Sequence, residues 1–200
     1  MELLLIRHAE PVKIVEASGP ADPHLAERGY EQARRLAEYL SGERIDGVWS
    51  SPMVRAKETA APLADALGLE VVVDVELAEY DKEATSYIPI EELKAAKDER
   101  WFAMVEGNFE ERGIDPIEFQ QGVVRAIEHI ITGNPGATIA AVCHGGVINA
   151  YLGHILGIKR PLWFEPRYTS IHRVMASRRG DRSLQTLNEI AHLRGTDLLA

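Results

Sequence analysis

The sequence predicts an α/β fold in which a largely parallel sheet lies between two layers of helices, a three-layer α/β/α sandwich. Short, continuously apolar runs, which are typical of strands buried on both faces, alternate along the chain with segments of helical periodicity. The length of 200 residues and the hydrophobic content of 46% suit one compact domain with a substantial core. We therefore expect a single domain spanning residues 1–200.

The expected strands are short runs rich in aliphatic and β-branched residues. The first covers residues 2–6 and is broken by Arg7-His8. Another apolar run ends at Cys143-His144-Gly145-Gly146, and a turn at Arg179-Gly180-Asp181 joins the last two strands. The strands after the first are expected at 46–50, 71–75, 138–142, 170–176 and 183–190.

The expected helices carry apolar residues at helical spacing. They cover 25–40, a segment from Ser51-Pro52 to Gly68, 90–105, 116–132 and 147–156. Ser51 is expected to cap the second of these helices, with Pro52 at its first helical position. Since 80–136 is mostly helical and the least regular part of the chain, we expect it to form a lid or insertion.

The charge balance restricts the class of partner. Lys and Arg total 22 against 31 Asp and Glu, for a net charge of −9, which repels a polyanion over most of the surface. Nucleic acid is therefore not an expected partner. An anionic substrate has to be held by a small, concentrated basic pocket.

The lone cysteine, Cys143, forms no internal disulfide and excludes every multi-cysteine metal motif. It ends a buried run, so we interpret it as a small core residue rather than a nucleophile. No apolar stretch approaches the roughly 20 residues that a membrane helix needs, and the N-terminal run is too short for a signal peptide. We expect a cytoplasmic protein without a membrane partner.

Basic side chains follow two of the buried runs. Arg7 and His8 follow the first strand, His144 follows the strand at 138–142, and Arg55 lies in the first turn of the helix after the second strand. Ligands of open α/β sheets bind at the carboxyl ends of strands, so these residues are expected to meet. Two guanidinium forks and two imidazoles are suited to bind and transfer a phosphoryl group.

Two further features complete this pattern. Gly145 and Gly146 would let backbone N–H groups approach the anion at a helix N-terminus. A carboxyl group is also needed for proton transfer, and Glu79, just beyond the strand at 71–75, is placed to provide it. Glu10 and Glu58 are the other candidates, although Glu58 is more typical of a charge on a helix face.

These residues resemble, in order, the motifs of the histidine phosphatase superfamily, whose members share the phosphoglycerate mutase-like fold. Each motif is short, but the set spans nearly the whole chain. The matching segments are Arg7-His8-Ala9-Glu10, Leu25, Gly29, Gln32-Ala33, Ser50-Ser51-Pro52, Arg55-Ala56, Thr59-Ala60, Leu77-Ala78-Glu79, Cys143-His144-Gly145-Gly146, Thr169-Ser170-Ile171-His172, Leu187-Asn188 and Ala191-His192-Leu193.

The resemblance implies a metal-independent phosphatase of phosphate monoesters with no cofactor. His8 is then the phosphorylated nucleophile, Arg7, Arg55 and His144 bind the phosphoryl group, and Glu79 is the proton donor. We expect a backbone carbonyl to fix the tautomer of His8 and neighbouring arginines to lower its pKa, while burial or the substrate's charge raises the pKa of Glu79. The partner implied is a small phosphorylated molecule. A homodimer is one expectation for the assembly.

The chain also departs from the family pattern. Ala9, Pro11 and Ile14 replace the glycine, threonine and asparagine of the first motif, which predicts that one phosphate-contacting side chain is absent. Tyr80-Asp81-Lys82-Glu83 replaces the segment typical of cofactor-dependent mutases and fructose bisphosphatases. These activities are therefore less favoured.

Three rival interpretations remain from the residues alone. A phosphoglycerate mutase-type phosphotransferase needs the same groups, and a non-catalytic phosphate-binding protein could keep the basic pocket. An acyl hydrolase is a poor rival, because no G-x-S-x-G elbow supplies a serine to accompany His144-Gly145-Gly146. His172 and His192 match family positions in the closing strands, and we interpret both as structural.

Overall fold

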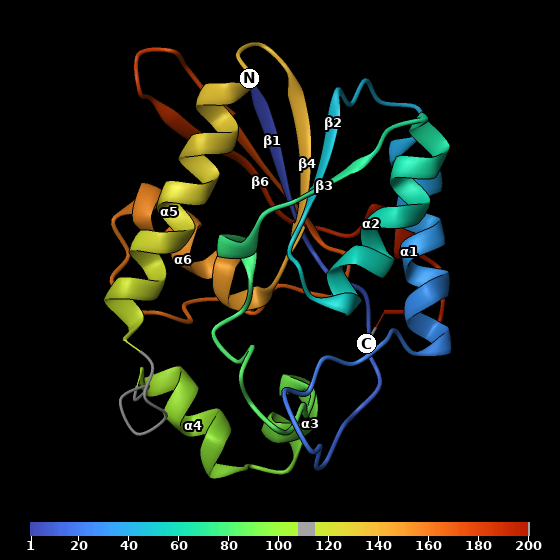
Figure 1. Cartoon of the computed structure of the whole chain (residues 1–200), viewed down its shortest axis with the longest axis vertical. Coiled ribbons are helices and arrows are strands. Elements are labelled where there is room, and N and C mark those ends of the chain that lie inside the picture. The colour runs from blue at the N-terminus through green and yellow to red at the C-terminus, as the bar shows by residue number, and fades with distance from the viewer. Residues whose placement is uncertain (108–114, 200) are drawn as a thin grey trace.

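The computed structural model describes residues 1–107 and 115–199 and has a mixed six-stranded sheet at its centre (Figure 1). The strand order is β3-β2-β4-β1-β5-β6, with the first four strands parallel and the last two antiparallel to their neighbours. The strands are β1 (Glu2–Arg7), β2 (Gly47–Ser50), β3 (Val71–Val73), β4 (Thr138–Cys143), β5 (Ile171–Ala176) and β6 (Arg182–Glu189).

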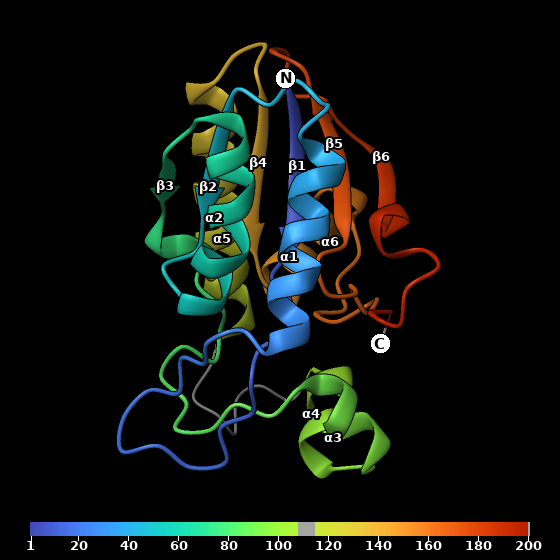
Figure 2. The same cartoon turned by 90° about the vertical axis from the view of Figure 1, so that its right-hand side faces the viewer.

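Two pairs of helices cover the two faces of this sheet. The pair α1 (Glu27–Leu40) and α2 (Val54–Leu67) lies on one face, and α5 (Pro116–Gly133) and α6 (Gly145–Leu156) lie on the other (Figures 1 and 2). This arrangement confirms the expected three-layer sandwich with a largely parallel sheet. Over the described residues, no helix has both the length and the apolarity needed to cross a bilayer.

Strand β1 shows why its sequence is continuously apolar. Successive side chains of a strand point to opposite faces. Leu3 and Leu5 belong to the core beneath α5 and α6, whereas Leu4 and Ile6 belong to the core beneath α1 and α2, and all four are fully buried. The interior of a strand covered on both faces has no position at which a polar side chain would reach water, so the polar residues of β1 stand at its two ends, Glu2 and Arg7.

The expected lid at 80–136 is only partly correct. Helix α5 is a layer of the sandwich, because Val123, Ile127 and Ile130 are buried in the core. The expected helix 90–105 is two helices, α3 (Ile90–Ala95) and α4 (Glu99–Glu106), which lie beyond the carboxyl ends of the parallel strands (Figures 1 and 2). The chain breaks between them because Lys97 adopts φ 52° and Asp98 caps α4 by accepting from the Arg100 N–H.

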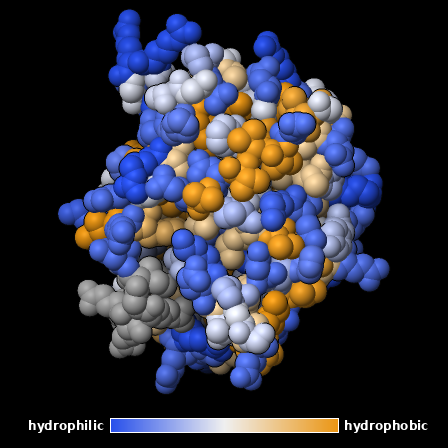
Figure 3. Space-filling model, in the orientation of Figure 1, coloured by the Kyte–Doolittle hydropathy of each residue, from blue (hydrophilic) through white to orange (hydrophobic). Residues whose placement is uncertain are grey.

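Two other boundaries differ from the expectation. Strand β3 ends at Val73, because Asp74 caps a 3-10 turn, η1 (Val75–Leu77), by accepting from the Glu76 N–H. Another short 3-10 turn, η3 (Ala191–Leu193), follows β6. As the edge strand, β3 exposes Val72 and Val73, and an apolar patch lies over this strand in the space-filling view (Figure 3).

Candidate active site

The carboxyl ends of β1 and β4 bring His8 and His144 together. The two strands are parallel neighbours in which Arg7 pairs with Cys143. His8 directly follows Arg7 and His144 directly follows Cys143, so both histidines stand just beyond the ends of their strands. The ring centroids lie 5.1 Å apart. A cavity of about 890 Å³ opens at this edge of the sheet, and its lining includes Arg7, His8, Arg55, Glu79 and Gly145. The prediction that these residues meet is confirmed.

His8 is held as a neutral imidazole with a defined tautomer. Its Nδ1 lies 2.8 Å from the carbonyl oxygen of Ala9, so Nδ1 carries the proton and donates it, which leaves Nε2 with a free lone pair. Burial lowers the pKa of His8 well below its ordinary value, and the charges of Arg55 and Arg7 lower it further. Both the expected carbonyl contact and the expected direction of the shift are present.

Arg7 is buried and only partly satisfied. Its Nη1 donates to Glu91 Oε1 at 2.9 Å and to the carbonyl oxygen of Pro166 at 2.6 Å, and its guanidinium carbon lies 4.0 Å from the ring centroid of Tyr168. Within the described part of the chain, its Nε has no hydrogen-bond partner. An unpaired buried guanidinium donor is costly unless a ligand accepts from it.

Arg55 shows the same incomplete pairing at the opposite wall. It is 1% exposed, its Nη2 donates to Asp81 Oδ1 at 3.3 Å, and its Nη1 lies 3.8 Å from Asp22 Oδ1. Tyr87 stacks beneath it, with 4.7 Å between the guanidinium carbon and the ring centroid. Among the described residues, nothing accepts a hydrogen bond from its Nε or Nη1. Together the two arginines therefore present three unpaired buried donors, a charged environment suited to an anion.

The basic pocket is more nearly neutral than the sequence suggested. Each arginine already has a carboxylate partner, Glu91 for Arg7 and Asp81 for Arg55. Although burial opposes it, the charge of Arg7 keeps the pKa of Glu91 below its ordinary value, so this partner is ionised. The pocket thus offers directed donors rather than a large excess of positive charge.

Glu79 lies across the cavity, just after η1, and its pKa is strongly shifted. Burial raises this pKa most and the nearby charge of Asp81 adds to the effect, bringing it to about 7, although hydrogen bonds from the backbone N–H groups of Gly146 and Tyr80 oppose the shift. These N–H groups donate to Oε2 at 2.8 Å and to Oε1 at 3.1 Å. Such a carboxyl can both give and take a proton near neutral pH.

Gly146 serves a different purpose from the one expected. Its N–H was expected to approach the bound anion, but it is used by Glu79 instead. A Cβ at this position would lie 2.2 Å from Glu79 Oε1, so only glycine allows the start of α6 to come this close. Gly145 does line the cavity, and a Cβ at position 145 would meet no described atom within 4 Å.

His144 is fully buried beside His8, and Ser51 controls its orientation. The Nε2 of His144 lies 2.7 Å from Ser51 Oγ, which also accepts from the Met53 N–H at 3.3 Å. When the hydroxyl donates its own proton to Nε2, the ring proton lies on Nδ1. This Nδ1 has no partner among the described residues. Burial and then the charge of Arg55 lower the pKa of His144 well below its ordinary value.

The prediction that Ser51 caps a helix is wrong. Helix α2 begins at Val54 after an extended Met53, which makes no side-chain cap. Asp22 supplies the acceptor, because its carboxylate oxygens lie 2.9 and 3.0 Å from the Val54 N–H. The hydroxyl of Ser51 is therefore free to face His144.

The remaining candidates lie outside the cavity. Glu58 lies 2.6 Å from His24 and accepts from the Leu25 N–H, and Glu10 lies 3.7 Å from Arg28. Cys143 is buried in β4, where burial raises the pKa of its thiol. The buried His172 accepts from the Asn188 N–H and contacts Ser170, and His192 contacts Thr169, which agrees with structural roles.

Several residues that contact the two arginines were not found from the sequence. They are Glu91, which lies in α3 within the helix expected at 90–105, and Tyr87 and Tyr168, which lie in irregular segments. The only available signal was the unusual segment after Glu79, which contains Asp81. Ile14, which replaces an asparagine of the family pattern, pairs through its backbone with Tyr87.

Comparison with known proteins agrees with this geometry. A family model described as histidine phosphatase superfamily (branch 1) matches residues 3–190. The chain belongs to the histidine phosphatase superfamily.

Relatives of this histidine phosphatase family member include both phosphatases and mutases. Phosphoserine phosphatase 1 of Hydrogenobacter thermophilus is 31% identical over 169 residues, which cover 79% of this chain and 77% of the relative. A probable phosphoglycerate mutase of Yersinia enterocolitica is 27% identical over 164 residues, which cover 79% and 76%.

A solved structure shares the whole architecture. Phosphoserine phosphatase of Entamoeba histolytica, in complex with 3-phosphoglyceric acid, matches with a TM-score of 0.74 and 25% identity, covering 96% of this chain and 98% of its own. A mycobacterial glucosyl-3-phosphoglycerate phosphatase, 19% identical, shares the fold with a TM-score of 0.74 over 94% and 99% of the two chains.

Proposed function

We propose that this histidine phosphatase hydrolyses phosphate monoesters through a covalent phosphohistidine at His8. One observation carries the proposal: a neutral histidine with a free Nε2 and a carboxyl whose pKa is about 7 line the same cavity. A nucleophile and a proton donor of this kind are the two groups that phosphoester cleavage requires. The phosphatases among the relatives support the same class of reaction.

The unpaired donors around His8 would hold the phosphoryl group. Arg7 Nε, Arg55 Nε and Nη1, and His144 Nδ1 are buried and without hydrogen-bond partners in the described chain. They lie around the two histidines, so the equatorial oxygens of a phosphoryl group could accept from them as charge develops. The N–H of Gly145 stands at the start of α6, where the helix dipole favours an anion.

The proposed cycle has two displacement steps. In the first, His8 Nε2 forms a bond to phosphorus, the bond from phosphorus to the ester oxygen breaks, and Glu79 gives its proton to that oxygen. In the second, Glu79 takes a proton from water, the water oxygen bonds to phosphorus, and the bond from phosphorus to Nε2 breaks. Inorganic phosphate leaves, and His8 and Glu79 return to their starting states.

A mutase is the alternative that the relatives favour most, since one of them is a probable phosphoglycerate mutase. A mutase would return the phosphoryl group of His8 to a second hydroxyl instead of to water. Trapping of the phosphoenzyme followed by dilution into buffer distinguishes the two: rapid loss to inorganic phosphate supports the phosphatase, and persistence until an alcohol acceptor is added supports the mutase.

The first test is hydrolysis of p-nitrophenyl phosphate between acidic and neutral pH with excess EDTA, by the wild type and His8→Ala in parallel. We expect EDTA-resistant activity in the wild type and a loss of at least about 10³-fold in His8→Ala. Full activity in His8→Ala would contradict the proposal. An inactive wild type that still binds inorganic phosphate would instead identify a phosphate-binding protein.

A further inference from the structure

The cavity is much larger than the phosphoryl site at its base. Its volume of about 890 Å³ lies within the range of pockets that enclose a whole organic ligand. Beyond the two arginines and Glu79, one side is formed by what we call the outer wall. The outer wall comprises Tyr80, Leu93, Trp101, Met104, Leu162 and Trp163.

This outer wall is apolar and built before any ligand binds. Leu93 and Met104 are buried in a separate cluster against which Tyr80, Trp101 and Leu162 pack. The hydroxyl of Tyr80 lies 3.0 Å from Met104 Sδ, so even the polar atom of this tyrosine is engaged within the wall. Preformed apolar surface of this kind favours a ligand that can be removed from water.

The loop that carries Trp163 is equally well fixed. The Oδ1 of buried Asn149 accepts from the N–H groups of Trp163 and Phe164 at 3.0 and 3.2 Å, and Asn149 Nδ2 donates to the Phe164 carbonyl oxygen at 3.1 Å. The indole N–H of Trp163 donates to the Asn149 carbonyl oxygen at 3.3 Å. The wall on this side is therefore held by α6 rather than by contacts that a substrate would have to supply.

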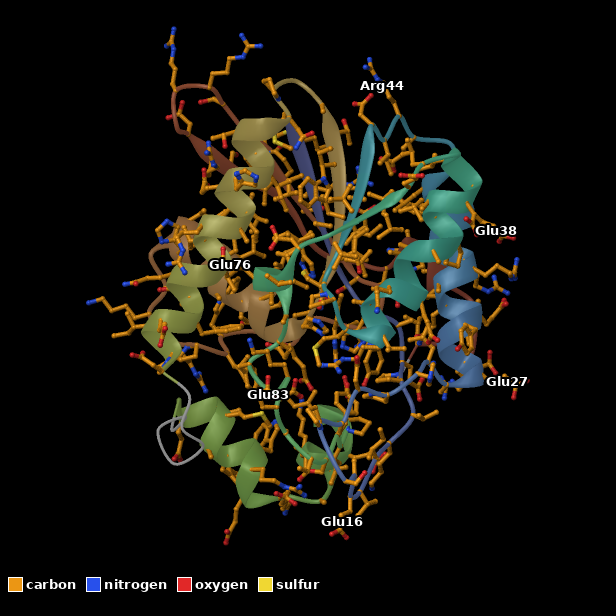
Figure 4. All side chains as sticks on the ribbon, viewed as in Figure 1. Glu16, Glu27, Glu38, Arg44, Glu76 and Glu83 are labelled. Atoms are coloured by element: carbon orange, nitrogen blue, oxygen red, sulfur yellow. The ribbon has the colours of Figure 1, made fainter. Side chains whose placement is uncertain are left out.

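Arg100 and Glu165 near the outer wall are already paired, whereas Arg160, which also lines the cavity, donates from its Nε to the Val105 carbonyl oxygen at 3.1 Å rather than to a carboxylate. Arg100 makes two 2.8 Å hydrogen bonds to Asp98, and Glu165 accepts from Lys94 at 2.6 Å. Lys82 and Glu83 have opposite charges and are exposed, and Figure 4 shows Glu83 on the segment between the sheet and the α3–α4 pair. A carboxylate on a substrate would thus have to compete with an existing partner for Arg100, be met by a solvated lysine with a glutamate beside it, or reach the exposed Arg160.

We propose that the substrates are phosphate monoesters of bulky apolar alcohols, aromatic or long-chain aliphatic, in preference to compact charged esters such as phosphoserine or 3-phosphoglycerate. The inference rests on the proposed function for the placement of the phosphoryl group next to His8. From there the leaving group extends past Glu79 onto Trp101, Met104 and Leu162. Phosphoserine and 3-phosphoglyceric acid are bound by the Entamoeba histolytica phosphatase. The proposed preference would therefore give the two proteins different substrate specificities.

The test is a series of primary n-alkyl phosphates from ethyl to hexyl. Their leaving oxygens have nearly the same basicity, so kcat/KM reports the burial of the chain and not the chemistry. Each added methylene buried on the wall should raise kcat/KM by about two- to fourfold, and hexyl phosphate should exceed ethyl phosphate by about one to two orders of magnitude. Phosphoserine and 3-phosphoglycerate should not exceed ethyl phosphate.

Two neighbouring aromatic residues of α4 provide a matched pair of variants. Trp101 lines the cavity, whereas Phe102 does not and is 43% exposed. Trp101→Ala should lower the hexyl-to-ethyl ratio of kcat/KM by about tenfold, and Phe102→Ala should leave that ratio at the wild-type value. Since the wild-type series decides the proposal by itself, the result does not depend on whether either variant folds.

Binding of ethyl and hexyl phosphonate, measured by calorimetry, separates this inference from the proposed function. Tighter binding of hexyl phosphonate by a protein that hydrolyses no ester would defeat the phosphatase proposal and support the apolar preference. A hydrolase with equal kcat/KM for ethyl and hexyl phosphate, or with phosphoserine or 3-phosphoglycerate as its best substrate, would overturn the preference and leave the phosphatase proposal standing.

Discussion

The base of the cavity and its outer wall are built in different ways. The base comprises Arg7, His8, Arg55 and Glu79 of the cavity lining and His144 beside His8, and it lies at the carboxyl edge of the sheet, next to the two large cores of the sandwich. Most of the outer wall rests on a small separate cluster formed by α3, α4 and irregular segments, whereas Trp163 packs against the core beneath α5 and α6. The comparison indicates that the groups proposed for phosphoryl chemistry stand on the large cores of the sandwich, whereas most of the wall proposed to select the leaving group stands on a separate, smaller cluster.

Glu91 connects the two regions. It lies at the start of α3 and pairs with Arg7 of the base, while its other oxygen accepts from the Tyr168 hydroxyl at 3.1 Å. A change in α3 could therefore reach the phosphoryl site through this one carboxylate. The predictions below test how separate the two regions are, from the largest expected effect to the smallest.

Replacement of Glu79, the carboxyl at the bottom of the cavity, should have the largest effect. Glu79→Gln removes the proton donor while keeping the shape of the side chain, and kcat/KM for alkyl phosphates should fall by about 10² to 10⁴-fold. The loss on p-nitrophenyl phosphate should be much smaller, because its leaving group needs little protonation. Glu27→Gln, a change at an exposed site on α1 outside the cavity, is the control, and equal losses on both substrates by Glu79→Gln would contradict the role of Glu79 as the acid.

The pH dependence of the wild type should depend on the same carboxyl. With a pKa of about 7, Glu79 is protonated below that pH and loses its proton above it. Activity on alkyl phosphates should therefore fall by about tenfold per pH unit above 7, relative to activity on p-nitrophenyl phosphate at the same pH. Because both substrates are phosphate monoesters, their ratio largely removes the contribution of substrate ionisation, and a ratio independent of pH would argue against Glu79.

Ser51 should act as a positioning residue through the tautomer of His144. Ser51→Ala leaves Nε2 of His144 without its partner, so the ring proton is no longer held on Nδ1, and kcat/KM should fall by about tenfold. Nitrogen NMR of His144 should show the change of tautomer, which a purely structural role would not produce.

Ser50 offers a close control for this change. It is also buried, but its hydroxyl donates to the Ser51 carbonyl oxygen and makes no contact with His144. Ser50→Ala should therefore keep the wild-type tautomer. If Ser51→Ala also keeps it, the proposed role of the Ser51 hydroxyl is wrong.

The link between the two regions should give the smallest effect. Glu91→Gln keeps a hydrogen-bond acceptor for Arg7 but removes a negative charge beside the phosphoryl site, so inorganic phosphate should inhibit about two- to tenfold more strongly. Glu92→Gln is the matched control, since the adjacent Glu92 pairs with the half-exposed Lys13 at 2.6 Å. Weaker inhibition in Glu91→Gln would show instead that Glu91 is needed mainly to hold Arg7 in place.

Most of the architecture and the residues of the base could be predicted from the sequence. Apolar periodicity is a local property, so strands such as β1 and helices such as α1 could be recognised from a few neighbouring residues. The positions of Arg7, His8 and His144 followed from the same reasoning, because the carboxyl ends of parallel strands meet at one edge of a sheet. The order of these motifs was sufficient to indicate the superfamily.

Only the tertiary structure decided how these residues are paired and protonated. Glu79 bonds to Gly146, 67 positions away, and Arg7 to Glu91, 84 positions away, and no local pattern marks such pairs. The pKa of Glu79 depends on its burial and on Asp81, and the orientation of His144 depends on Ser51. The outer wall brings residues of α3 and α4 together with Tyr80 and Leu162, which lie in distant segments. Burial and electrostatic interaction depend on distances in space, which a sequence determines only through the complete fold.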